Sequence, residues 1–147
     1  MDQSRQKTAQ LLTYSGAIPF VALTLLSARH EATTSISLPT EALIHAYGAI
    51  IISFICGISW GIYLFKSCPL NLFIISNIIA LIAWCSLMLT YTPATTIQLA
   101  SFLALLKIDH ILFKANVIEQ WYFSLRCRIT AIVTPTLVAY LAISSLT

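Results

Sequence analysis

The chain has 147 residues, of which 59% are hydrophobic and 9% are charged, and its formal net charge at pH 7 is +3. Soluble domains carry about 25% charged residues, and a chain this short must keep much of its surface in contact with solvent. A soluble globular domain is therefore excluded, and the composition predicts an integral membrane protein. The basic residues are spread thinly, which excludes nucleic-acid binding because that requires a clustered basic face.

The first apolar segment, residues 11–28, follows a short basic head. It is longer than the ~7–15-residue apolar core of a signal peptide. A large Leu26 also occupies the minus-three position, where a signal cleavage site needs a small residue. We therefore expect a spanning helix that is kinked at Pro19, with Gly16 allowing a neighbouring helix to approach closely.

The next spans follow from the distribution of charged residues. Residues 42–65 contain no Asp, Glu, Lys or Arg, and at about 1.5 Å per residue they can cross a hydrocarbon core of about 30 Å. The following uncharged stretch, 70–106, is too long for one crossing. The Thr92-Pro93 step breaks it, because proline cannot continue an intact helical hydrogen-bond ladder. We therefore expect a third helix over residues 70–91 and a tight turn into a fourth.

The fourth span is expected over residues 94–113, which takes Asp109 into the membrane, because a helix that stops at residue 106 is too short. Residues 114–128 mix charged and aromatic side chains, a combination typical of a membrane interface. The last span is expected over residues 129–146, with Pro135 as a kink. The sequence therefore predicts an all-α fold, in which the whole chain forms one polytopic membrane helix bundle with five transmembrane helices.

The Lys and Arg residues are distributed unequally between the two sides of this bundle. Loops rich in Lys and Arg stay on the cytoplasmic side of a membrane. With the N-terminus inside, seven basic residues lie on that side and one, Arg29, lies outside. The seven are Arg5, Lys7, Lys66, Lys107, Lys114, Arg126 and Arg128. We therefore expect the N-terminus in the cytoplasm and the C-terminus outside.

The second helix carries small residues at four-residue spacing. They are Ala49, Ser53, Gly57 and Gly61. In lipid no hydrophobic effect drives helices together, so a stripe of small residues favours association by letting backbones approach closely. We expect this helix-packing stripe to contact other helices of the same chain. Two alternatives remain open, a homodimer face and a groove for a lipid or small apolar ligand.

His45 extends the same stripe, and Glu41 lies one turn before it on the same helix face. Together with His30 and Glu31 of the preceding loop they form a candidate divalent-metal site. The preferred interpretation is that His45 hydrogen-bonds near the outer interface and that the protein holds no metal. The four cysteines form no CxxC pair, so we expect inert thiols without a zinc site or a disulfide framework.

Asp109 is the most informative single residue, because an ionisable group within the membrane is costly and should be paired. Arg126 and Arg128 lie at the same depth, so we expect a structural ion pair between Asp109 and one of them. A carboxylate that handles protons or a substrate is the alternative. His110 is expected to point elsewhere, and Asn77 is expected to hydrogen-bond a neighbouring helix.

Short motifs along the chain resemble a known family. They are Tyr47-Gly48-Ala49, Ser53-Phe54, Gly57 and Trp60-Gly61 in the second helix, residues 16–20 before it, and Trp121-Tyr122 and Leu125-Arg126 near the end. In these patches the chain resembles the domain of unknown function 3429 family, which includes the mitochondrial transmembrane protein 69. The resemblance implies a small helical membrane protein and no particular activity. It also draws attention to Tyr47, Trp60 and Ser59, the last of which stands where the family commonly has a His.

No HExxH, GxSxG or phosphate-loop motif occurs, and we expect no catalytic residue and no cofactor. The preferred function is a non-enzymatic assembly, scaffold or lipid-organising factor, with the bilayer and a second copy or another membrane protein as partners. One alternative is a small transporter or proton-coupled permease that uses Asp109. The other is a lipid- or quinone-binding protein or enzyme, with its ligand beside His45, Tyr47 and Trp60. The lack of an Arg- and Ser-rich presequence favours the bacterial over the mitochondrial inner membrane.

Overall fold

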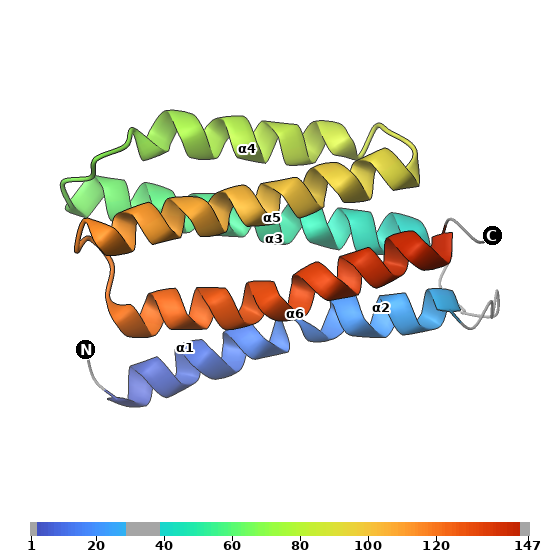
Figure 1. Ribbon diagram of the computed structural model, residues 1–147, viewed down its shortest axis with the longest axis horizontal. Coiled ribbons are helices and arrows are strands. Elements are labelled where there is room, and N and C mark those ends of the chain that lie inside the picture. Colours follow the sequence, from blue (N-terminus) through green and yellow to red (C-terminus); the bar gives the residue numbers. More distant parts are fainter. Residues whose placement is uncertain (1–2, 29–38, 145–147) are drawn as a thin grey trace.

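The computed structural model describes residues 3–28 and 39–144, and every regular element within these two ranges is a helix (Figure 1). The helices are α1 (Gln3–Ser15), α2 (Ile18–Ala28), α3 (Thr40–Phe65), α4 (Leu72–Ser86), α5 (Tyr91–Lys114) and α6 (Gln120–Ser144). Four stretches are long and apolar enough to cross a membrane. The first is formed by α1 and α2 together, and the other three are α3, α5 and α6. The helix α4 is apolar but shorter. The predicted all-α membrane helix bundle is confirmed. The count of five crossings and the direction of insertion stay predictions.

The helix α3 holds the bundle together, because it packs against α2, α4 and α5, while α6 packs against α2 and α5 (Figure 1). The largest fully buried apolar side chains come from all five of these helices, and α4 contributes one of them, Leu72 at its start. The outer surface is also apolar, with Leu11, Phe54 and Leu64 each more than 60% exposed at 69%, 68% and 62%. Water-soluble monomers rarely expose such side chains over whole helices, so this surface is suited to lipid.

The turn between α4 and α5 lies earlier than the sequence suggested. α4 ends at Ser86, and the backbone N–H of Leu87 donates to the carbonyl of Trp84 at 3.0 Å. The break expected at Thr92-Pro93 is therefore wrong, because Pro93 lies in the first turn of α5. Proline is tolerated there, since N–H groups of the first turn have no partner within their own helix. The 15 residues of α4 span about 22 Å, less than the hydrocarbon thickness of about 30 Å.

The short connection from α5 to α6 begins with a C-terminal cap of α5. Asn116 adopts a left-handed conformation with φ of 56°, and the N–H of Val117 donates to the carbonyl of Leu112 at 2.9 Å. Both features are typical of a helix that ends in a Schellman motif. The ammonium group of Lys66, just after α3, donates to the carbonyl of Val117 at 2.6 Å. The α3–α4 and α5–α6 connections are thereby fastened together at one end of the bundle.

The helix α6 begins at Gln120 and continues through Pro135. Most of the segment expected at the membrane interface, residues 114–128, is therefore the first part of a long helix rather than a separate element. The interfacial composition of this segment reflects the position of the first turns of α6 near one end of the bundle (Figure 1).

One apolar stretch near the N-terminus is broken into α1 and α2 at Gly16 and Ala17. Pro19 has no N–H group with which to bond the carbonyl of Ser15, so the helical ladder cannot pass intact. Tyr47 of α3 donates its hydroxyl hydrogen to the carbonyl of Gly16 at 2.8 Å, which supplies a partner where a membrane offers no water. α2 packs closely on α3 and α6, whereas α1 touches α6 lightly. The break therefore leaves space beside α1.

We expect Tyr47→Phe to lower the free energy of unfolding by about 0.6–1.5 kcal/mol, because it removes one hydrogen bond at the broken helix. The measurement is the unfolding transition in mixed micelles of detergent and SDS. Tyr63→Phe on the same helix is the control, since the Tyr63 hydroxyl makes no hydrogen bond within the described part of the chain and its ring packs on Phe73. Equal effects of the two substitutions would contradict a role for the hydroxyl of Tyr47.

Candidate functional site

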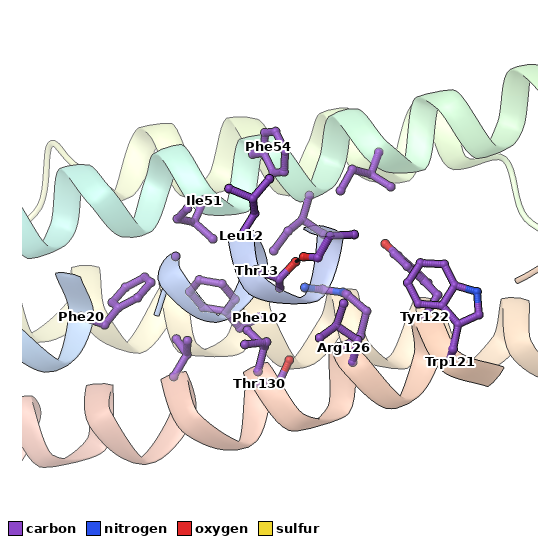
Figure 2. A pocket seen from close by; sticks show the side chains of 17 residues that line it. Leu12, Thr13, Phe20, Ile51, Phe54, Phe102, Trp121, Tyr122, Arg126 and Thr130 are labelled. Atoms are coloured by element: carbon purple, nitrogen blue, oxygen red, sulfur yellow. Dashed lines mark hydrogen bonds between the residues drawn. The ribbon is translucent and has the colours of Figure 1, made fainter. Parts of the chain in front are cut away.

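A cavity of about 380 Å³ lies between α1, α3, α5 and α6 (Figure 2). Its volume falls within the range of about 300–1,000 Å³ that is typical of small-molecule sites. Five aromatic side chains contribute to its largely apolar wall, namely Phe20, Phe54, Phe102, Trp121 and Tyr122. At its rim Leu12 of α1 and Phe54 of α3 are 66% and 68% exposed. The cavity therefore opens sideways between α1 and α3, on the face of the bundle that would meet lipid.

The polar feature of this cavity is an arginine held by a carboxylate. Arg126 of α6 donates from Nε to Oδ2 of Asp109 on α5 at 2.7 Å, and both side chains are 6% exposed. Of the two partners that the sequence left open for Asp109, the structure pairs it with Arg126, and Arg128 is exposed on another face of α6. Arg126 lines the cavity, so the ion pair lies directly against its wall.

The ion pair leaves hydrogen-bonding capacity in side chains that line the same space. Nη2 of Arg126 and the hydroxyl of Thr130 are buried and have no partner within the described part of the chain. The two residues are four apart on α6, so they share one face of that helix, and both line the cavity. Figure 2 shows the Arg126 side chain reaching from α6 in among the other lining side chains. A buried polar group without a partner costs about 1–3 kcal/mol, which makes this wall a place where a bound acceptor stabilises the protein.

A second polar cluster ties α3 to α5 towards the other end of the bundle. The hydroxyl of Thr95 donates to the carbonyl of Tyr91 at 2.9 Å and accepts from Nε2 of His45 at 2.6 Å. The ring of His45 is buried and stacks on the ring of Tyr91, with a centroid separation of 5.3 Å. The side-chain amide of Gln98 donates to the carbonyl of His45 at 2.9 Å and to the hydroxyl of Ser86 at 3.3 Å. His45 is thus a structural residue of the helix interface in this arrangement.

Gly48 belongs to this cluster, although the sequence suggested it merely as part of a motif. A Cβ atom built on Gly48 would overlap the side-chain amide of Gln98, which is fully buried. The position of Gly48 three residues after His45, on the same helix face, is the signal that would have identified it. No hydrogen-bonded chain of described side chains connects this cluster to the pair of Asp109 and Arg126, since buried Ile52 and Phe102 lie among the groups between them.

The small-residue stripe of α3 does not pack as expected. Ala49 is buried, but Ser53 and Gly57 are exposed. A Cβ atom built on Gly57 or Gly61 meets no described atom within 4 Å. The expectation that these two glycines contact other helices of the same chain is therefore wrong for the part of the chain that the structure describes. A contact with another protein at this face stays a prediction.

Two further candidates on α3 lie apart from the cavity. Ser59 is buried, and its hydroxyl donates to the carbonyl of Ile55 at 3.4 Å within the same helix. Trp60 is 42% exposed and packs its ring on Phe73 of α4, with a centroid separation of 4.7 Å. The structure does not bring Trp60 together with His45, so a shared ligand site of these residues is not formed.

The remaining polar candidates lie on exposed helix faces. Asn77 is exposed on α4 and makes no hydrogen bond with another helix within residues 3–28 and 39–144, contrary to expectation. His110 is exposed, and its ring lies 5.5 Å from that of Phe123. Arg128 contributes to a second, more polar hollow between α1 and α6, beside Trp121. None of these three residues shares the cavity that Arg126 lines.

The described residues include no candidate metal site, and their cysteines are not joined by disulfides. No group of three or more His, Cys, Asp or Glu side chains suited to a metal ion occurs among the described residues, and His30 and Glu31 lie outside them. The four cysteines are free thiols. Burial raises the pKa of the Cys68 thiol in the α3–α4 connection, which keeps it protonated at neutral pH.

Residues 5–142 match the model of a family described as "Protein of unknown function (DUF3429)", and the chain belongs to this family. The family suggested by the short motifs is thereby confirmed, while a particular likeness to the mitochondrial transmembrane protein 69 stays a prediction. Neither a curated protein nor a solved structure matches the chain. The family description names no activity, so the cavity and its ion pair are the features that bear on function.

We expect Asp109→Ala to lower the free energy of unfolding by about 3–5 kcal/mol, because removal of one partner leaves a buried charge uncompensated. Arg126→Ala should have an effect of the same size. The double variant should be less destabilised than the sum of the two, since neither charge then remains alone. Arg128→Ala is the control and should change stability by no more than about 0.5 kcal/mol, because Arg128 is exposed. Strict additivity of the two single effects would contradict the pairing.

We expect Gly48→Ala to destabilise the protein by about 1–3 kcal/mol, because the new methyl group must displace an amide that is held by two hydrogen bonds. Gly57→Ala is the matched control on the same helix. It should be neutral or stabilising by up to about 1 kcal/mol, since alanine favours helix and no atom of the described residues lies within 4 Å of a Cβ at that position. Unfolding transitions of the two variants in the same detergent provide the comparison, and the reverse order would contradict the assignment of the tight contact to Gly48.

Proposed function

We propose that this membrane protein binds a lipid-like molecule, taken up from the surrounding bilayer, in the cavity between α1, α3, α5 and α6. The observation that carries the proposal is the combination of an apolar space of about 380 Å³ with unpartnered donors on one wall. An amphiphile matches both properties, because its chain replaces lipid contacts and its polar group satisfies the donors. This is the lipid-organising form of the non-enzymatic role suggested by the sequence.

The position of the opening supports entry from the membrane rather than from water. The rim residues Leu12 and Phe54 are both apolar and exposed, and they belong to helices long enough to span a bilayer. A molecule dissolved in the bilayer could pass between them without leaving an apolar surrounding. The opening lies beside α1, which packs less closely on the bundle than α2 does.

The other two functions receive less support from the geometry. A scaffold role would use the outward face around Gly57, which has the small residues for a close contact but no feature that identifies a partner. A transporter or permease would use Asp109, and that carboxylate is engaged by Arg126. No hydrogen-bonded route continues from this pair to the polar cluster at His45 within the described residues. We further propose the bacterial inner membrane as the location, with the mitochondrial inner membrane as the alternative.

The proposal predicts that Ala9→Trp reduces the bound lipid-like molecule. Ala9 lines the cavity from α1, so a tryptophan there fills space that the ligand needs. We expect the affinity for the co-purified lipid to fall by about tenfold, and the fraction of protein that carries it in native mass spectrometry to fall accordingly.

Ala131→Trp is the matched control, because Ala131 is an exposed position on α6 outside the cavity. It adds the same side chain to the lipid-facing surface and should leave the bound fraction unchanged. Thermal unfolding of both variants shows whether each is folded. An unchanged bound fraction in folded Ala9→Trp would overturn the proposal.

A further inference from the structure

The net charge of the cavity wall indicates which class of ligand the cavity can bind. Arg126 is the charged residue among the side chains that line it, and its partner Asp109 lies directly behind. The guanidinium and the carboxylate carry opposite unit charges, and both side chains are 94% buried, which follows from their exposure of 6%. The site is therefore neutral before any ligand enters.

An anionic ligand would disturb this balance. A carboxylate or phosphate beside Arg126 would give the site two negative charges for one positive charge, in a region without water to screen them. Burial of a charge without its own counterion is among the most costly events in a low-dielectric interior. A cationic ligand would meet Nη2 of Arg126, which can donate but not accept hydrogen bonds.

A neutral acceptor has neither difficulty. A carbonyl oxygen can accept from Nη2 of Arg126 and from the hydroxyl of Thr130 without adding charge to the site. The donor from Arg126 is charged, and hydrogen bonds to charged donors are stronger than those between neutral groups. The aromatic side chains of Phe54, Phe102 and Tyr122 offer ring surfaces to a flat or unsaturated group that carries the carbonyl.

We infer that the cavity selects a neutral amphiphile whose carbonyl oxygen accepts hydrogen bonds from the unpartnered donors of Arg126 and Thr130. This inference rests on the proposed function, since it names the class of molecule bound in the same cavity. Two sources share this chemistry, a quinone with an isoprenoid or alkyl tail and a neutral glycerolipid with ester carbonyls. Asp109 is then the residue that sets specificity, because it neutralises the arginine that holds the ligand.

The test compares three probes of similar chain length on the purified full-length protein in detergent. They are decylubiquinone, dioctanoylglycerol and laurate, and binding is read from native mass spectra and from quenching of tryptophan fluorescence, to which Trp121 in the cavity wall contributes. We expect at least one neutral probe to bind about tenfold more tightly than laurate, because the anion alone adds net charge to the site. The tighter of the two neutral probes identifies the source.

The charge argument is tested separately with Asp109→Asn. This substitution keeps the shape of the side chain and leaves Arg126 without its counterion, so the affinity for laurate should rise by about tenfold while that for the neutral probe changes little. Glu41→Gln is the matched control, since it also removes one negative charge but lies at the start of α3, away from the cavity. It should leave all three affinities unchanged.

The outcomes separate the inference from the proposed function. Tighter binding of laurate than of both neutral probes by the unmodified protein overturns the inference and leaves the proposed function standing, and this comparison decides even where Asp109→Asn does not fold. A folded Asp109→Asn variant with unchanged laurate affinity also overturns the inference. If none of the three probes binds and Ala9→Trp retains its co-purified lipid, the proposed function fails as well.

Discussion

A bilayer supplies no hydrogen-bond partners, and this constraint shapes every polar position in the structure. The carbonyl of Gly16, freed where the first apolar stretch breaks, is bonded by the hydroxyl of Tyr47. The carboxylate of Asp109 is bonded by Arg126. Six buried polar side-chain atoms of the described residues lack a partner, and two of them, Nη2 of Arg126 and the hydroxyl of Thr130, belong to residues that line the cavity. The unpartnered groups in residues of the cavity wall are therefore more informative about function than the apolar core.

The cavity lies next to the break between α1 and α2. The residues before Pro19 cannot continue the helical ladder, so α1 leaves the direction that α2 follows between α3 and α6. Broken helices beside a site near the middle of the membrane recur in membrane proteins because irregular backbone is tolerated where it lines a cavity. Here the irregular turn at Gly16 lies in the cavity wall.

The sequence predicted the helices well and their contacts poorly. Apolar runs without charge determine where helices can span a membrane, and the cost of a buried carboxylate predicted a pair for Asp109 with a neighbouring arginine. The turn predicted at Pro93 was wrong, because proline breaks the interior of a helix but is accepted in its first turn. The helix contact predicted at Gly57 was wrong, because four-residue spacing places residues on one face of a helix but does not determine which neighbour that face contacts. The close approach occurs at Gly48 instead. The cavity was not predictable, since it depends on how α1, α3 and α6 are placed relative to one another.

The ion pair also explains why an arginine can serve a ligand site inside a membrane. A lone guanidinium at this depth would be costly and would attract any anion or water that reached it. Paired with Asp109 through Nε, it becomes part of a neutral unit that still carries a free and strongly polarised donor at Nη2. The carboxylate thereby fixes the orientation of the donor and removes the field that would favour anions. A lysine in place of Arg126 would not hold a second donor in a fixed direction, because its three N–H groups share one nitrogen at the end of a flexible chain.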